Sequence, residues 1–581
     1  MARSSGVHCG GGAWRLAGRT VRVGPQLRRL RARGSAVAAV MLLVSLSSGP
    51  PTAQAIEPPS VDPALVPADG APGPDQPMRR SNSCSVPITV SNPDVAQLAP
   101  GFDMLGIAAA WQYSTGNGVP VAVIDTGVTP NPRLPAIAGG DYIMGGAEGL
   151  GGLQDCDAHG TIAASIIAAA PLGILPMPRP MPEVPAFPPP AGPPPSIGAP
   201  LPPADIPGPP APPPIPAPVT ITQVAPPPPP PPPPPEEGAV APASGPADPQ
   251  TEDEPAVPPP PPGAPDGVVG VAPHATVISI RQSSRAFEPV NPQRFGYDDE
   301  RVKAGTLATL AKAVVHAADM GAKVINISVT SCVQVAAGLD QQVLGAALWY
   351  AATVKDAVIV AAAGNVGEAG CADNPMFDPL NPSDPRDWHQ VKVISSPSWF
   401  SDYVLSVGGV DATGAPIDKS MAGPWVGVAA PATHVMGLSP QGGVPVNAYP
   451  PVRVGEKNMP FWGTSFSAAY VSGVAALVRA KYPQLTAHQV INRIMQTAHN
   501  PPAGVDNRVG YGLVDPVAAL TFNVPAGDPL APGSQQRVIT PPPPPPPPDH
   551  RARTVALGFL GVIAATVLAA AITARIRRAT K

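Results

Sequence analysis

Three short motifs place an aspartate, a histidine and a serine among small residues. They are Asp125-Thr126-Gly127, His159-Gly160-Thr161 and Gly463-Thr464-Ser465-Phe466-Ser467-Ala468. A serine hydroxyl becomes a good nucleophile when a base takes its proton. A histidine can do so near neutral pH, and a buried carboxylate fixes the tautomer of that histidine. The motifs therefore predict acyl transfer, with Ser465 as nucleophile, His159 as base and Asp125 as the orienting carboxylate.

The stretches around these motifs predict an open parallel sheet that would position them. Apolar runs typical of buried parallel strands cover 119–124, 275–280, 323–327 and 357–362, and Asp125 directly follows the first. Amphipathic spacing predicts a helix within 304–322, and helical patterns follow His159 at 162–170 and Ser465 at 469–480. Thr486 begins a capping box that opens a further helix. The alternation predicts an α/β fold with a doubly wound parallel sheet.

The two ends of the chain indicate export and membrane attachment. Residues 1–34 contain eight arginines and no acidic residue, an apolar run covers 36–46, and Ala53-Gln54-Ala55 has the small residues that signal peptidase requires. We therefore predict a signal peptide over 1–55, with an internal core helix as the alternative. Residues 555–574 contain no charge and are long enough to cross a bilayer, although a buried C-terminal helix is an alternative. The basic residues within 575–581 predict a cytoplasmic tail, and hence a single-pass protein of the cell membrane.

Proline divides the exported body. Of the 91 prolines, 43 lie in residues 171–266, which we predict to be an extended, disordered insertion within a peptidase domain over 101–523. A solvated spacer, a docking surface for a partner and a self-cleaved regulatory flap remain open as roles for it. Residues 524–550 contain eight consecutive prolines, 541–548, and predict a stiff linker before the membrane segment. Residues 56–100 form an N-terminal extension.

The distribution of charge limits the partners of the body. Every charged residue in 1–55 and in 551–581 is basic, which leaves 22 Lys and Arg against 40 Asp and Glu in between. Nucleic acid and anionic lipid are therefore not expected as partners of the body. No group of carboxylates has the pattern of a calcium loop, and no pair of cysteines has the spacing of a zinc site. We expect neither a metal nor a cofactor.

The chain resembles the subtilases over about residues 100–170 and 267–520. The order Asp, His, Ser is that of subtilisin, and Gly463 to Gly473 resembles the serine motif of the family. The segment from Ala361 to Asn365 resembles the one whose asparagine completes the oxyanion hole. The resemblance implies that the amide of Asn365 donates to the oxyanion together with the backbone N–H of Ser465.

The resemblance also implies a substrate pocket. The family usually has a glycine pair along one wall of the S1 pocket, where this chain has Ser328, Val329 and Thr330. These residues and Gly364 are expected to contact substrate. A narrower or more polar wall is expected, so the preference of better-known relatives is not carried over. The substrate class implied is protein or peptide.

The overall organisation resembles the mycosins, which are subtilisin-like proteases associated with type VII (ESX-type) secretion. The long proline-rich insertion resembles one branch of them. This resemblance implies a catalytic domain on the periplasmic side, processing of secreted proteins and association with the membrane complex of the secretion system. A second hypothesis is that the fold chiefly holds this complex together and that proteolysis is dispensable.

Four cysteines remain after the predicted leader is removed, in an oxidising compartment where three pairings are open. We favour Cys84–Cys156 and Cys332–Cys371. The first pair would tether the N-terminal extension three residues before His159, and the second would join the segment after 323–327 to the oxyanion segment. The extension is then expected to wrap the body and to remain attached.

Overall fold

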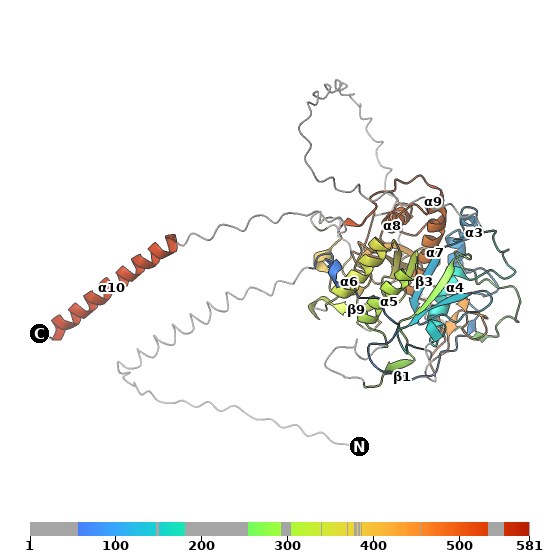
Figure 1. Cartoon of the computed structure of the whole chain (residues 1–581), viewed down its shortest axis with the longest axis horizontal. Helices are drawn as coiled ribbons and strands as arrows, with labels where there is room; N and C mark the ends of the chain where they lie inside the picture. The colour runs from blue at the N-terminus through green and yellow to red at the C-terminus, as the bar shows by residue number, and fades with distance from the viewer. Residues whose placement is uncertain are drawn as a thin grey trace, which may run out of the picture. The chain divides into compact units, whose positions relative to one another are not determined.

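The computed structural model describes thirteen stretches of the chain, which leave out the predicted signal peptide, residues 181–253 of the predicted insertion and residues 533–550 of the predicted linker (Figure 1). The described residues are 56–146, 150–180, 254–291, 304–337, 340–368, 370–376, 380, 384, 386–451, 453, 455–502, 504–532 and 551–579, with side chains limited to 562–578 in the last stretch. The predictions for 1–55, 181–253 and 533–550 lie outside the described residues.

The centre of the fold is a parallel sheet of seven strands in the order β13-β12-β10-β8-β3-β6-β4. Four of the strands are those predicted from apolar runs, and they are β3 (Pro120–Asp125), β6 (Thr276–Arg281), β8 (Val324–Ile327) and β10 (Val358–Ala362). The prediction of a parallel sheet is confirmed, since each neighbouring pair runs parallel.

Three strands of this sheet were not predicted. They are β4 (Ala136–Asp141), β12 (Val404–Val410) and β13 (Val426–Pro431). Each contains glycine, which weakens the apolar pattern that predicts a strand. Tertiary pairing overrides this weak local preference: β12 and β13 are buried at every residue.

Helices cover both faces of the sheet, as a doubly wound fold requires. Successive residues of β3 face opposite sides: Val121 and Val123 belong to the core beneath α4 (His159–Ala168) and α7 (Thr464–Lys481). Ala122 and Ile124 belong to the core beneath α5 (Leu307–Asp319) and α6 (Gln342–Trp349). The predicted helix within 304–322 is therefore α5. The capping box is also confirmed, because Thr486 and Gln489 exchange both bonds at the start of α8 (Ala487–Gln496).

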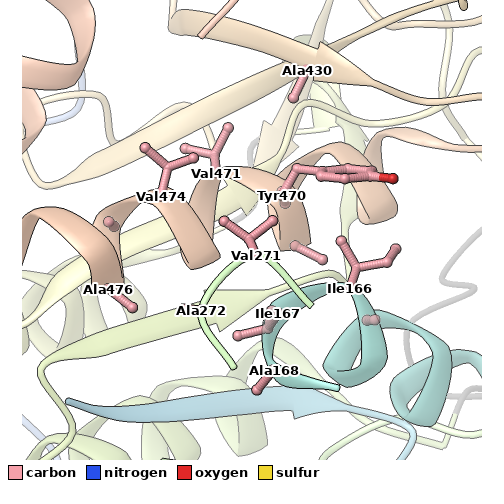
Figure 2. Close-up of a cluster of buried hydrophobic side chains, with 14 of the residues drawn as sticks. Ile166, Ile167, Ala168, Val271, Ala272, Ala430, Tyr470, Val471, Val474 and Ala476 are labelled. Carbon is pink, nitrogen blue, oxygen red and sulfur yellow. The ribbon is translucent and has the colours of Figure 1, made fainter. Parts of the chain in front are cut away.

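The short segment that precedes β6 packs against both α4 and α7. Figure 2 shows Val271 between Ile166 and Ile167 of one helix and Val471 and Val474 of the other. The backbone N–H of Val271 donates to Ile166 O over 2.8 Å. Gly473 of α7 permits this approach, because a Cβ there would lie 2.5 Å from the Cβ of Val271. The helices that carry His159 and Ser465 pack against each other and also share this contact with Val271.

The N-terminal extension lies along the body at several points. Its β1 (Met78–Arg80) pairs with β7 (Phe287–Pro289), and its β2 (Thr89–Val90) pairs with β5 (Ala256–Val257). Asp69 and Asp75 pair with His316 and Lys312 of α5. A disulfide joins Cys84 of the extension to Cys156, and a second disulfide joins Cys332 to Cys371. The described extension therefore contacts the body along its length, and the disulfide ties it three residues before His159.

The two ends of the predicted insertion meet at one buried ion pair. Leu172 and Asp266 form a β-bridge, and the guanidinium of Arg133 donates to both carboxylate oxygens of Asp266 over 2.6 and 3.1 Å. Arg133 also donates to the carbonyls of Ala170 and Val268, which flank the two ends. The two ends of the predicted insertion are therefore held together within the domain by the bridge and by Arg133.

We expect Arg133→Ala to lower the free energy of unfolding by about 3 kcal/mol, because Asp266 would remain buried without its cation. Arg79→Ala provides the control, since its pair with Glu288 is exposed and is expected to contribute less than about 1 kcal/mol. Denaturant unfolding of the two variants measures the difference. Equal losses of unfolding free energy in the two variants would show that Arg133 does not hold the two ends of the insertion together.

The last described stretch forms helix α10 (Arg551–Ala579), which belongs to a different compact unit from residues 1–534. Among the described residues, no helix has both the length and the apolar character that crossing a membrane requires. In α10, side chains are described for residues 562–578.

Candidate active site

The three predicted catalytic residues come from three elements that meet at one edge of the sheet. Asp125 is the last residue of β3, His159 is the first residue of α4, and Ser465 is the second residue of α7. Strand β3 lies between β6 and β8, where the chain order of the strands reverses. Open α/β sheets bind their ligands beyond the carboxyl ends of the strands at such a point.

Asp125 and His159 form a close pair. The Nδ1 atom of His159 lies 2.8 Å from Oδ1 of Asp125, whose side chain is fully buried. The backbone N–H of Thr126 also donates to this oxygen, over 2.6 Å. Gly160 is required beside the pair, because a Cβ there would lie 2.1 Å from Gly127 O. The arrangement fixes the imidazole so that Nε2 is available to accept a proton.

The surroundings of His159 raise its pKa above the ordinary value of 6.5. Burial lowers this pKa, but the negative charge of Asp125 and its hydrogen bond outweigh burial. Arg285 opposes the increase through its positive charge, and Asp155 adds to it. His159 is therefore a stronger base than a free imidazole.

Ser465 lies at the start of α7, which begins at Thr464 rather than at the predicted residue 469. The prediction placed this helix too late because Thr464, Ser465 and Ser467 are weak helix formers. The Ser465 hydroxyl is buried and donates to the carbonyl of Ser328 over 3.0 Å. No hydrogen bond between Ser465 and His159 is recorded among the described residues. Transfer of its proton to His159 would require the hydroxyl to rotate away from Ser328, and catalytic hydrogen bonds often form only when substrate binds.

A ring contact brings the serine motif against the histidine. Phe466 follows Ser465 directly, and its ring centroid lies 5.0 Å from that of His159 with the two planes tilted by 34°. Phe466 is fully buried and also contacts Phe461, which in turn contacts Tyr449. The imidazole is thus held on one side by Asp125 and on another by an aromatic ring.

Asn365 lies beyond β10 and is bonded to the residue before the serine. Its Oδ1 accepts from the backbone N–H of Thr464 over 3.0 Å and from the Thr464 hydroxyl over 3.1 Å. Since Oδ1 serves both donors, the amide orientation is fixed and Nδ2 is left to donate elsewhere. Gly364, at φ +107°, places its own N–H 3.2 Å from the same hydroxyl. Both residues adjoin the N-terminus of α7, as an oxyanion hole requires.

The predicted substrate wall follows β8. The hydroxyl of Ser328 is buried between Asn326 and the carbonyl of Ser465, whereas Val329 and Thr330 are half-buried. The chain continues into β9 (Ser331–Gln334), which pairs with β11 (Val393–Ser396). The Cys332–Cys371 disulfide joins β9 to the segment after Asn365. The disulfide therefore joins the segments that follow the predicted wall and the predicted oxyanion residue.

We expect Asn365→Ala to lower kcat by about 10²- to 10³-fold with little change in KM, because the lost donor would act only on the transition state. Asn374→Ala is the control, since Asn374 is equally buried and its bonds among the described residues are to backbone groups of residues 392–393 and of Ala422. Steady-state kinetics on a peptide substrate measures both. A loss in KM alone, or equal losses in the two variants, would exclude the oxyanion role.

A further carboxylate near the pair, Asp155, was missed in the sequence. It is buried, lies four residues before His159 and accepts hydrogen bonds from both Thr126 and Thr161. Burial raises its pKa to about 7, although the hydrogen bonds from Thr161 and Thr126 lower it. A clue was present in the sequence, since Asp155 lies beside Cys156 and shortly before the histidine motif.

Across the described stretches, no group of three or more His, Cys, Asp or Glu side chains could hold a metal ion. The chemistry available to Asp125, His159, Ser465 and Asn365 is acyl transfer through a serine ester.

The sequence matches one family model and several known proteins. A sequence model of the subtilase family matches residues 250–512, which include Asn365 and Ser465. Mycosin-2 of Mycobacterium tuberculosis is 76% identical over 554 residues, which cover 95% of this chain and 99% of the relative. Mycosin-5 of the same organism is 46% identical, over 87% of this chain and 89% of its own length.

Two solved structures are similar to this chain in fold and sequence. The crystal structure of MycP1 from the ESX-1 type VII secretion system has a TM-score of 0.62 at 39% identity, and the match covers 82% of this chain and 99% of that one. A chain in the periplasmic assembly of the ESX-5 inner membrane complex has a TM-score of 0.62 at 43% identity, with 85% and 100% covered.

Proposed function

This chain belongs to the mycosins, which are subtilisin-like serine proteases of the subtilase family, and from that premise we propose that Asp125, His159 and Ser465 are its catalytic triad. The observation that carries the proposal is the 2.8 Å contact between His159 Nδ1 and the fully buried Asp125, at the sheet edge where α7 presents Ser465. The reaction proposed is hydrolysis of peptide bonds within proteins.

The proposed reaction follows from these positions. The Ser465 hydroxyl rotates from the Ser328 carbonyl, His159 Nε2 takes its proton, and the oxygen attacks the carbonyl carbon of the substrate. The oxyanion accepts from Asn365 Nδ2 and the backbone N–H of Ser465, at the positive end of α7. His159 then gives its proton to the leaving amine. Water next attacks the acyl ester while His159 Nε2 takes its proton, and His159 gives that proton to the departing oxygen of Ser465.

We propose that Ser328, Val329, Thr330 and Gly364 contact the substrate side chain next to the cleaved bond. The Cys332–Cys371 disulfide supports this by restraining both sides of the proposed pocket. Ser328 is committed to Asn326 and Ser465, so its hydroxyl is held inside the wall. The half-buried Val329 and Thr330 are then the side chains that set specificity.

Profiling with a peptide library tests the proposed activity. Purified protein is incubated with peptides of mixed sequence, and new N-termini are identified by mass spectrometry. The proposal predicts a set of cleavages that share a preference at the residue before the cut and that disappear with Ser465→Ala. An absence of new N-termini at any pH between 5 and 9 would contradict the activity.

We further propose that the protein is attached to the cell membrane and associated with a type VII secretion complex. The relative in the ESX-5 inner membrane complex supports the association and the periplasmic side. The uncharged residues 555–574 support an anchor, followed by the cytoplasmic residues 575–581. The domain limits proposed for the rest are a signal peptide over 1–55, an extension over 56–100, a peptidase domain over 101–523 with its insertion at 171–266, and a linker over 524–550.

A structural role in that complex is the second candidate function. It is favoured by the 43% identical chain in the ESX-5 periplasmic assembly, whose full length this chain matches. Secretion assays separate the two roles. A strain with Ser465→Ala that assembles the complex and exports normally would show that proteolysis is dispensable for export, whereas assembly with altered processing of exported proteins would support the enzyme.

A further inference from the structure

The loops that carry the aspartate and histidine motifs share one buried carboxylate, Asp155. Its Oδ1 accepts from the hydroxyl of Thr126 over 2.9 Å, and its Oδ2 accepts from the hydroxyl of Thr161 over 2.7 Å. Thr126 follows Asp125, and Thr161 lies two residues after His159. One side chain therefore bonds to both catalytic loops, although the two loops are 34 residues apart in the chain.

The direction of each hydrogen bond is fixed by a second contact. The Thr126 hydroxyl accepts the backbone N–H of Gly160 over 2.9 Å, so its own proton points to Asp155. The Thr161 hydroxyl accepts the backbone N–H of Thr129 over 3.0 Å, so its proton also points to Asp155. Each threonine thus links the aspartate loop to the histidine loop, and both links end on one carboxylate.

Asp155 also holds the residue before the histidine. The backbone N–H of Ala158 donates to Oδ1 over 2.8 Å, and the N–H of Thr161 donates to Oδ2 over 2.8 Å. Ala158 has φ +68° and is buried, a left-handed conformation that an alanine adopts only when its surroundings impose it. The bond from Ala158 to Asp155 therefore contributes to the direction in which His159 leaves the loop.

We propose that Asp155 is a positioning residue that fixes the Asp125–His159 contact by tying the two catalytic loops to one carboxylate. It touches neither substrate nor the reacting atoms, and it acts through Thr126, Ala158 and Thr161. The inference rests on the proposed function for its effect on rate, but its effect on the Asp125–His159 hydrogen bond is independent of that function.

Asparagine at position 155 tests this directly. All the bonds described here are donated to Asp155, so an amide NH₂ in place of one oxygen would face donors and lose at least one loop. We expect Asp155→Asn in the full chain to lower kcat by about 10²-fold, the effect of a displacement near 1 Å, while KM changes less than about twofold. The control is Asp266→Asn, which alters an equally buried carboxylate remote from the triad.

A threonine pair keeps the test decisive if Asp155→Asn does not fold. Thr161→Val removes the hydroxyl at nearly constant volume, and Thr161→Ser keeps it. The proposal expects a lower kcat for valine and a rate near that of the original protein for serine. Equal rates for the two variants would overturn it.

Spectroscopy separates this inference from the proposed activity. The low-field proton resonance of His159 Nδ1–H, measured with ¹⁵N-histidine in a Ser465→Ala background, should broaden or shift in Asp155→Asn and stay unchanged in Asp266→Asn. A protein without peptidase activity whose resonance still responds would contradict the proposed function and support the positioning role. An Asp155→Asn protein with reduced stability but an unchanged resonance and unchanged kcat would overturn the positioning role.

Discussion

Replacing Ser465 by alanine is expected to abolish peptide hydrolysis, with a fall in kcat on the order of 10⁶-fold. The physical reason is that no other hydroxyl on α7 has an equivalent place: Ser465 alone combines the helix start with the contact to Ser328. When a serine nucleophile is removed, the remaining catalysis comes only from binding and oxyanion stabilisation. Rates on a cleaved peptide from the library measure the loss.

Ser467→Ala is the matched control for this change. Ser467 lies on the same turn of α7 and is also buried, but its hydroxyl donates to the carbonyls of Ala430 and Pro431. We expect a modest loss of stability and a kcat within a few-fold of the original. Activity that survives Ser465→Ala but not Ser467→Ala would mean that the nucleophile has been misassigned.

Asp125→Asn is expected to lower kcat by about 10⁴-fold, because the amide cannot hold the imidazole in the tautomer that presents a basic Nε2. The pH profile should change as well. In the original protein kcat/KM should rise with pH through a midpoint above 6.5, since the raised pKa keeps His159 protonated below it. Without the charge of Asp125, burial of His159 dominates, so the midpoint should move to lower pH.

A control for the pH shift is available in Asp157→Asn. This carboxylate lies closer in sequence to His159 but bonds to Ser284 and the backbone of Arg285 instead. The midpoint should stay where it is in this variant. A midpoint that moves equally in both variants would show that general charge, rather than the direct contact to Asp125, sets the basicity of His159.

Local patterns in the sequence predicted the elements that bear the chemistry. Strands β3, β6, β8 and β10 are mainly apolar runs, and such runs occur where both faces of a strand are covered. The capping box at Thr486 was also predictable from the sequence, because it depends on two residues three positions apart. The order of the three motifs then predicted the site without any knowledge of how the strands pair.

Features that depend on distant contacts were not predictable in the same way. Strands β4, β12 and β13 contain glycines, and their pairing partners decide their conformation. The bonds from Thr126 and Thr161 to Asp155 join residues that only the folded sheet brings together. The hydrogen bond from the Ser465 hydroxyl to the Ser328 carbonyl joins residues 137 positions apart, and no local sequence pattern predicts it. The spacing of apolar residues indicates which residues are buried, but it does not indicate which polar groups will form hydrogen bonds.

Covalent labelling of the active serine is the most direct test of the proposed triad. The protein is treated with a fluorophosphonate, digested and mapped by mass spectrometry, alongside His159→Ala. We predict one modified serine, Ser465, in the original protein and almost no modification in His159→Ala, because the reagent reacts only with a hydroxyl whose proton a base removes. Modification of a different serine, or equal labelling of Ser465 in both proteins, would contradict the account.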